Sequence, residues 1–231
     1  MTEARSARVL RATIEYDGTR YRGWQSQVNA RTVQGALYHA VRPVLGEGTR
    51  IFGAGRTDAG VHAFGQVASL ALERSVAGTE VPRLRRDLND RLPPDVHVLA
   101  LDPAPAGFHA RHDAALRIYR YRLSRRRTAF GKPWVWWVRD SLDAAAMRRA
   151  AALVVGRHDF SSFCENPAGH DSTLVEVGRG RWHAEKVAGL LTAPSTEPAR
   201  VTAPPSGLFL EAVLYEGDPP PPEIDPLRPG F

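Results

Sequence analysis

A glycine-rich stretch between two apolar segments, residues 51–72, constrains the fold of this chain more than any other feature. Ile51 and Phe52 precede it, and an apolar run from Val67 to Leu72 follows it. Its glycines are Gly53, Gly55, Gly60 and Gly65. Glycine at this density marks backbone that turns sharply or lets another molecule come close. The sequence therefore predicts a sharply turning loop here, followed by a strand over 66–72.

Three polar side chains lie among these glycines: Arg56, Asp58 and His62. Residues two apart point to the same side of an extended segment, and a neighbouring arginine favours the charged form of a carboxylate. One interpretation is an ionised Asp58 in a backbone-lined cleft, acting as nucleophile or base. The other is an ordinary turn, in which Asp58 caps a backbone amide and Arg56 is solvated.

The segment GRTDAGVHA, residues 55–63, resembles the active-site motif of the tRNA pseudouridine synthase A family. Further segments match the family in the same order: IEYDGTRYRGWQSQ (14–27), RTVQGAL (31–37), DLNDRLPPDVHV (87–98), FHARHDA (108–114), RIYRYRL (117–123), DFSSFC (159–164) and APPSGLFLEAVLY (203–215). Several ordered motifs over most of a chain are far more specific than one short pattern.

The resemblance implies isomerisation of uridine to pseudouridine at positions 38, 39 and 40 of the tRNA anticodon arm, without cofactor or metal. Asp58 matches the catalytic aspartate, which adds to the ring, traps the sugar or abstracts a sugar proton. Arg56 is expected to hold Asp58 ionised and to contact the substrate. Tyr119 matches a tyrosine that packs on the flipped base, although the residue alone favours an aromatic side chain that fills the core face of the sheet. His62 is expected to be structural or to contact RNA.

The charge of the chain fits a nucleic-acid partner. The formal net charge is +6, the pI is about 10.0, and all but two of the 31 basic residues are arginine. Arginine suits phosphates and stacks on bases, although a genomic preference for arginine codons explains the count equally well. Arg20, Arg22 and Arg111 are the expected RNA contacts. The cluster 125–127 is more typical of a solvated loop than of a binding patch.

Strands alternate with helices in two halves, which predicts an α+β fold with a mixed, largely antiparallel sheet and helices on its outer face. The resemblance implies two similar subdomains, an RNA-binding cleft and a homodimer. The expected boundaries are 1–104 for the subdomain with the catalytic motif, 105–217 for a shortened second subdomain, and 218–231 for a disordered proline-rich tail. No segment reaches the ~18 apolar residues of a membrane span, so we expect a cytoplasmic protein.

Local signals predict several elements in more detail. Thr32 is a good N-cap for a helix with an apolar stripe, which Pro43 would bend or shorten. A second helix is expected over 142–155, with Ser141 as a possible cap. Trp24 either stacks in an RNA groove or lies in the core. The single cysteine, Cys164, excludes a disulfide framework.

The second half departs from the family pattern. After DFSSFC the family continues through two strands into a helix that carries a cleft arginine, but here ENPAGHDST (165–173) leads at once to LVEVGRGRW (174–182). Either Arg179 or Arg181 substitutes for that arginine, or the chain is a catalytically impaired tRNA-binding protein that keeps the fold. A carboxylate-dependent glycosidase would need a second paired acid, which the central motif lacks.

Overall fold

The computed structural model describes residues 6–163, 173–193, 195, 197 and 203–220. The chain forms two compact units, one of residues 1–120 with 208–231 and the other of residues 121–207. The last strand thus returns to the first unit. The subdomains expected at 1–104 and 105–217 stay a prediction. Most of the expected tail, 221–231, lies outside the described residues, while Asp218 at its start is bound to Arg11 by two hydrogen bonds of 2.8 and 2.6 Å.

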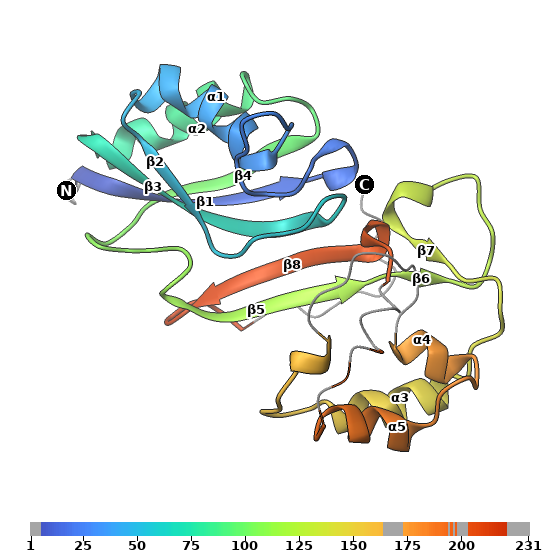
Figure 1. The fold of residues 1–231 in the computed structure, drawn as a ribbon. Coiled ribbons are helices and arrows are strands. Elements are labelled where there is room, and N and C mark those ends of the chain that lie inside the picture. The colour runs from blue at the N-terminus through green and yellow to red at the C-terminus, as the bar shows by residue number, and fades with distance from the viewer. Residues whose placement is uncertain (1–5, 164–172, 194, 196, 198–202, 221–231) are drawn as a thin grey trace. The chain divides into compact units, whose positions relative to one another are not determined.

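A mixed, mostly antiparallel sheet forms the centre of the first unit (Figure 1). Its strands, among the described residues, are β1 (Ser6–Tyr16), β2 (Arg50–Gly53), β3 (His62–Ala77), β4 (Val96–Pro103), β5 (Ala114–Tyr121) and β8 (Leu208–Tyr215). Their order is β4-β1-β3-β8-β5, with β2 also paired to β3. The pairs β1–β3, β1–β4 and β2–β3 are antiparallel, and β3–β8 is parallel. The predicted α+β class with a mixed sheet is confirmed.

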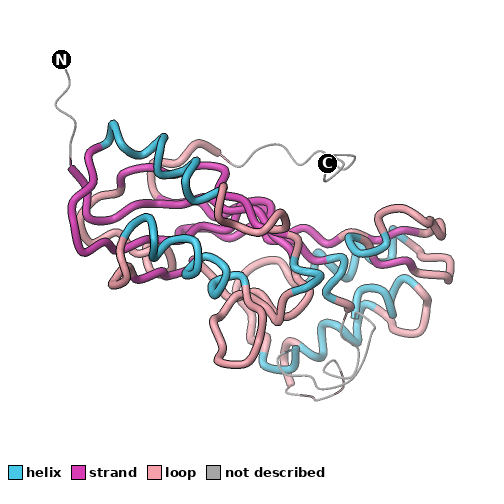
Figure 2. The backbone as a smooth tube through the Cα atoms, turned by 90° about the horizontal axis from the view of Figure 1, so that it is seen from above, coloured by secondary structure: helices cyan, strands magenta, loops and turns pink. Residues whose placement is uncertain are grey.

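Two helices, α1 (Val33–Leu45) and α2 (Val81–Asn89), pack on one face of this sheet (Figures 1 and 2). Thr32 caps α1 as predicted, its hydroxyl accepting a hydrogen bond from the amide of Gly35. Pro43 does not shorten α1, which continues to Leu45. Gly46, at a φ of +106°, then ends the helix in a conformation that glycine adopts without strain.

The core of the first unit lies between the sheet and these helices. Leu10 and Ile14 of β1, Leu70 of β3 and Val33 of α1 are all at most 1% exposed, and Trp24 is equally buried. Burying one such side chain contributes about 1.5–3 kcal/mol. Of the two interpretations of Trp24, the structure shows the core one.

The second unit is smaller in its core and richer in turns. Its described elements are β6 (Leu123–Ser124), β7 (Trp136–Trp137), α3 (Ala144–Leu153), α4 (Thr173–Gly178) and α5 (Ala184–Leu190). The cap of α3 is Asp143 rather than Ser141, because its carboxylate accepts hydrogen bonds from the amides of Ala145 and Ala146. These bonds lower the pKa of the Asp143 carboxyl. None of the helices in the described ranges is long and apolar enough to cross a membrane.

Candidate active site

The loop that joins β2 to β3, residues 54–61, contains the predicted catalytic motif, and its first residues are fixed by hydrogen bonds. The amide of Ala54 donates to the carbonyl of Val67 at 2.7 Å. Arg117 of β5 donates from Nε and Nη2 to the carbonyl of Ala54 at 3.0 and 2.8 Å. Gln66 of β3 donates to the carbonyl of Gly55 at 2.9 Å. Two strands of the sheet therefore hold the start of the loop.

The middle of the loop is held at Thr57. Its hydroxyl lies 2.8 Å from the Tyr16 hydroxyl, and its carbonyl accepts a hydrogen bond from the amide of Trp24 at 2.9 Å. Burial raises the pKa of Tyr16 from 10.0 to about 12, so its hydroxyl keeps its proton in solutions more alkaline than pH 10. Gly23, at a φ of +92°, lies so close in space to the 54–61 loop that a Cβ on it would be 2.6 Å from the Thr57 carbonyl oxygen. This close approach requires glycine.

Asp58 follows the pinned Thr57, and its side chain is exposed. Within the described part of the chain, its carboxylate accepts no hydrogen bond and forms no ion pair. Arg56 donates from Nε to Gln25 at 3.2 Å instead of pairing with Asp58. The structure thus shows neither the expected Arg56–Asp58 pair nor a backbone amide capped by Asp58. Hydrogen bonds fix the backbone that precedes Asp58, and the Asp58 carboxylate is accessible to a ligand.

Tyr119 lies beside the start of the same loop. Its hydroxyl is 3.8 Å from the position that a Cβ on Gly55 would take, and the Arg117 Nε is 3.7 Å from that point. Tyr119 is 47% exposed, so it does not fill the core. Its aromatic ring and hydroxyl are therefore available to a molecule that reaches the loop.

A cavity of about 350 Å³ borders the loop at Gly55 and Arg56. Arg111, which the sequence also predicted as a site residue, lines the same cavity, as do the rings of Phe52 and His109. These two rings lie 5.0 Å apart. None of the described residues that line the cavity is acidic, which suits an anionic or aromatic ligand.

The remaining RNA-contact candidates, Arg20 and Arg22, are exposed but do not line this cavity. They flank Tyr21, whose carbonyl accepts a hydrogen bond from the amide of Gly60 at 3.2 Å. They therefore belong to a segment that is hydrogen-bonded to the C-terminal end of the 54–61 loop.

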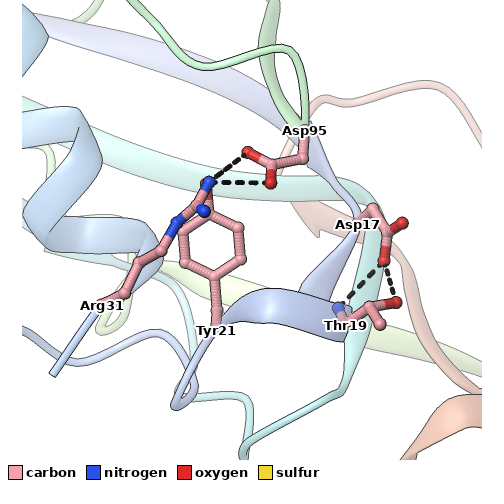
Figure 3. A network of polar contacts seen from close by, with 5 residues as sticks. All are labelled: Asp17, Thr19, Tyr21, Arg31 and Asp95. Carbon is pink, nitrogen blue, oxygen red and sulfur yellow. Dashed lines mark hydrogen bonds and ion pairs between the residues drawn. The ribbon is translucent and has the colours of Figure 1, made fainter.

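Polar contacts fix that segment in turn (Figure 3). Arg31 donates to both carboxylate oxygens of Asp95, at 3.0 and 2.8 Å, and lies over the Tyr21 ring at 4.6 Å. Tyr21 donates to Asp95 as well. Burial, followed by the hydrogen bond to Asp95, raises the pKa of Tyr21 to about 12. Asp17 accepts from the amide and hydroxyl of Thr19.

His62, at the end of the motif, is 1% exposed and stacks on Phe209 at 4.7 Å. Its Nδ1 lies 3.1 Å from the amide of Gly18 and 3.1 Å from Asp17 Oδ1. These contacts and its burial favour the structural role expected for His62 over contact with RNA.

The sequence did not assign a site role to Arg117 or Gln66. Arg117 could have been found because it lies two residues before Tyr119 on the same face of β5. Gln66 is fully buried within an apolar strand, where a polar side chain requires a hydrogen-bond partner.

Comparison with known proteins matches residues 12–113 to the family described as tRNA pseudouridine synthase. Three similar relatives, each named tRNA pseudouridine synthase A, come from Nitrobacter winogradskyi, Geobacter sulfurreducens and Myxococcus xanthus. The Nitrobacter and Geobacter proteins are 38% and 37% identical, over 89% and 90% of this chain and 94% and 100% of their own length. The Myxococcus protein is 38% identical, over 91% of this chain and 93% of its own. The chain belongs to the tRNA pseudouridine synthase family.

In this tRNA pseudouridine synthase family member, the matched region contains the whole 54–61 loop and Arg111, and ends before Tyr119. Arg179 and Arg181, considered above as substitutes for a cleft arginine, both pair with Glu176 in the second unit, at 2.7 and 3.4 Å. Arg179 also pairs with Asp140 at 2.8 Å. The position after Cys164, where the sequence indicates a missing block, lies outside the described residues.

Proposed function

We propose that this chain isomerises uridine to pseudouridine in tRNA, with Asp58 as the catalytic carboxylate. One observation carries the proposal: Asp58 is exposed and unpaired among the described residues, on a loop whose backbone is fixed at Ala54, Gly55 and Thr57. A reaction that requires a carboxylate at a defined position benefits from this rigidity, since small displacements of a reacting group are costly.

The reaction breaks the N1–C1′ bond of a uridine and forms a C5–C1′ bond, while the C5 proton is lost and N1 is protonated. Uracil is both the leaving group and the returning nucleophile, so no co-substrate is consumed. Asp58 adds to the ring, traps the sugar or takes a sugar proton, and each route uses the same open carboxylate. Tyr119 packs on the everted base, and Arg56 contacts the substrate from the adjoining cavity.

The substrate uridines in this proposal are those at positions 38, 39 and 40 of the anticodon arm. Arg20, Arg22 and Arg111, all exposed, contact tRNA phosphates, and the tRNA is held mainly through phosphates and shape. The proposed assembly is a homodimer in the cytoplasm. Light scattering of the purified protein tests the homodimer.

The test is to incubate the purified protein with unmodified tRNA and to map pseudouridine in the anticodon arm. Asp58→Asn should abolish the product while tRNA affinity stays within about twofold. Glu47→Gln makes the same carboxylate-to-amide change on a side chain that is 82% exposed, and should change neither. Product formation by Asp58→Asn at the wild-type rate would refute the catalytic assignment.

A second candidate is a tRNA-binding protein that has lost most of the activity. The alignment with the Nitrobacter relative covers 244 residues, whereas 89% of 231 is about 206, about 38 fewer. The Geobacter alignment covers 248 residues against about 208 of this chain, about 40 fewer. The relatives thus carry additional residues within the matched region, which supports the interpretation that this chain lacks an internal block.

The same experiment separates the two candidates. An impaired binder would retain tRNA in a filter-binding assay but would form no pseudouridine, and Asp58→Asn would have no activity to remove. Turnover and a melting temperature equal to those of a full-length relative would exclude impairment.

A further inference from the structure

The second unit contains a cavity of about 840 Å³ that the proposed reaction does not use. Val135, Trp136 and Pro204 are its more buried lining residues, and Arg127, Lys132 and Trp137 are exposed. The cavity therefore combines an apolar, partly aromatic wall with two cations.

Hydrogen bonds hold the walls of this cavity together. The amide of Trp136 donates to the carbonyl of Arg122 at 3.0 Å, and the amide of Arg122 donates to the carbonyl of Gly207 at 2.8 Å. The Tyr121 hydroxyl donates to the carbonyl of Pro204. Hydrogen bonds thus join three segments around the cavity, at residues 121–122, 136 and 204–207. The cavity is therefore held by contacts between segments and is not a single open turn.

Two cations, Arg127 and Lys132, line the cavity, and two more precede Arg127 in the sequence. Arg125, Arg126, Arg127 and Lys132 lie within eight residues, and none of them pairs with a carboxylate among the described residues. The Arg127 guanidinium lies over the Trp137 ring at 5.6 Å. Their charge is therefore not neutralised by those residues and remains available to an anion.

Aromatic surface is exposed in the same place. Trp137 is 40% exposed and Phe130, in the intervening loop, is 86% exposed. A solvated loop, the interpretation from sequence, accounts for the arginines but not for large aromatic rings left in water beside them. Cations interleaved with exposed aromatics are the usual composition of a surface that binds single-stranded nucleic acid.

We infer that this cavity binds an unstacked nucleotide of RNA, with its base against Trp136 and Trp137 and its phosphates beside Arg127 and Lys132. The inference rests on the proposed function in that the RNA is the tRNA substrate. A polyanion is favoured over a protein partner because these cations have no carboxylate partner within the part of the chain that the structure describes, and none of the described lining residues is acidic. The hydroxyls of Thr128 and Ser206, also in the lining, offer hydrogen bonds to a base edge.

The test compares tRNA affinity, measured by filter binding over a range of salt concentrations, with kcat at saturating tRNA. Trp137→Ala should weaken binding about tenfold, the effect of losing one base stack, and Trp137→Phe should restore most of it. Arg127→Glu should weaken binding and lower the salt slope by about 0.7–0.9 for each lost phosphate contact. kcat should stay unchanged in all three variants.

Arg83→Glu is the matched control, since Arg83 is 80% exposed on α2 and does not line the cavity; it should bind tRNA clearly more tightly than Arg127→Glu. Ultraviolet crosslinking of the wild-type protein to tRNA should label the peptide that contains Trp136 and Trp137, and this readout does not depend on a variant folding. Wild-type affinity in Trp137→Ala and Arg127→Glu, with no crosslink, would overturn the inference.

Two other outcomes would also overturn it. A change of oligomeric state in Trp137→Ala without a change in tRNA affinity would make this surface an interface between copies of the chain. Uridine monophosphate binding as tightly as tRNA would make it a free-nucleotide site. Because binding is measured separately from turnover, a wild-type protein that forms no pseudouridine would refute the proposed reaction and leave this inference standing on its own binding data.

Discussion

Replacing Arg117 tests whether activity depends on the hydrogen bonds that hold the start of the 54–61 loop. Arg117 donates twice to the carbonyl of Ala54 and once to the carbonyl of Arg111, at 3.0, 2.8 and 2.8 Å. Hydrogen bonds from a charged group contribute about 1.5–3 kcal/mol each. Two of these share one acceptor, and the third is exposed to solvent, so their joint contribution is about 2 kcal/mol.

Arg117→Lys is the informative change because it keeps the charge and removes the planar fork that reaches Ala54 with two donors. If all of the lost energy bears on the position of Asp58, kcat should fall about 30-fold. The KM for tRNA and its salt dependence should stay close to wild type. The assay is single-turnover tritium release from tRNA labelled at C5 of uridine, with KM taken from the dependence on tRNA concentration.

Arg111→Lys serves as the control, because Arg111 is exposed and is proposed to bind phosphate, a role that lysine can retain. If Arg117 also acts as a phosphate contact, lysine should rescue it in the same way. A kcat for Arg117→Lys within twofold of wild type would refute the positioning argument. A raised KM with an unchanged kcat would point to RNA binding instead.

Three further changes follow from the contacts around the loop. Tyr16, with its pKa raised to about 12 by burial, keeps its proton in the folded state above the pH at which the unfolded chain loses it. The contribution of Tyr16 to stability should therefore fall by about 2 kcal/mol as pH rises from 10 to 12, and Tyr16→Phe should remove this part of the pH dependence in urea unfolding while leaving the part that comes from Tyr21. Gly23→Ala should lower the free energy of unfolding by at least ~1 kcal/mol and reduce kcat, because its Cβ would meet the Thr57 carbonyl at 2.6 Å; equal melting curves would contradict this. Glu211→Leu should destabilise the protein by about 3 kcal/mol by leaving the buried Arg120 without its 2.9 Å partner, and thermal unfolding measures the loss.

Elements with strong local signals were predictable from sequence. The capped helix after Thr32 formed as expected, and the strand predicted over 66–72 lies within β3, because their hydrophobic periods match the buried faces. The cap of α3 was not resolved by pattern alone, since Ser141 and Asp143 are both good caps. Only the structure shows that the Asp143 carboxylate, and not the Ser141 hydroxyl, accepts the hydrogen bonds from the first amides of the helix.

The residues assigned to the candidate site from sequence stay a prediction, and their contacts could not be predicted. The expected pairing of Arg56 with Asp58 assumed extended backbone, whereas residues 56–58 belong to no strand and lie between a bend at 54–55 and a turn at 59–60, so residues two apart need not share a side. The bond from Arg117 to Ala54 joins residues 63 positions apart. Such a contact depends on sheet order, which no local pattern encodes.

The order of the strands also explains why the conformation of the 54–61 loop depends on β8, the last strand in the sequence. The 54–61 loop leads into β3, whose first residue, His62, pairs in parallel with Phe209 of β8. β8 lies next to β5, and the buried Arg120–Glu211 pair joins those two strands. β5 in turn carries Arg117 back to Ala54. The support of Asp58 is therefore a closed path through three strands, and it is complete only when β8 has inserted between β3 and β5.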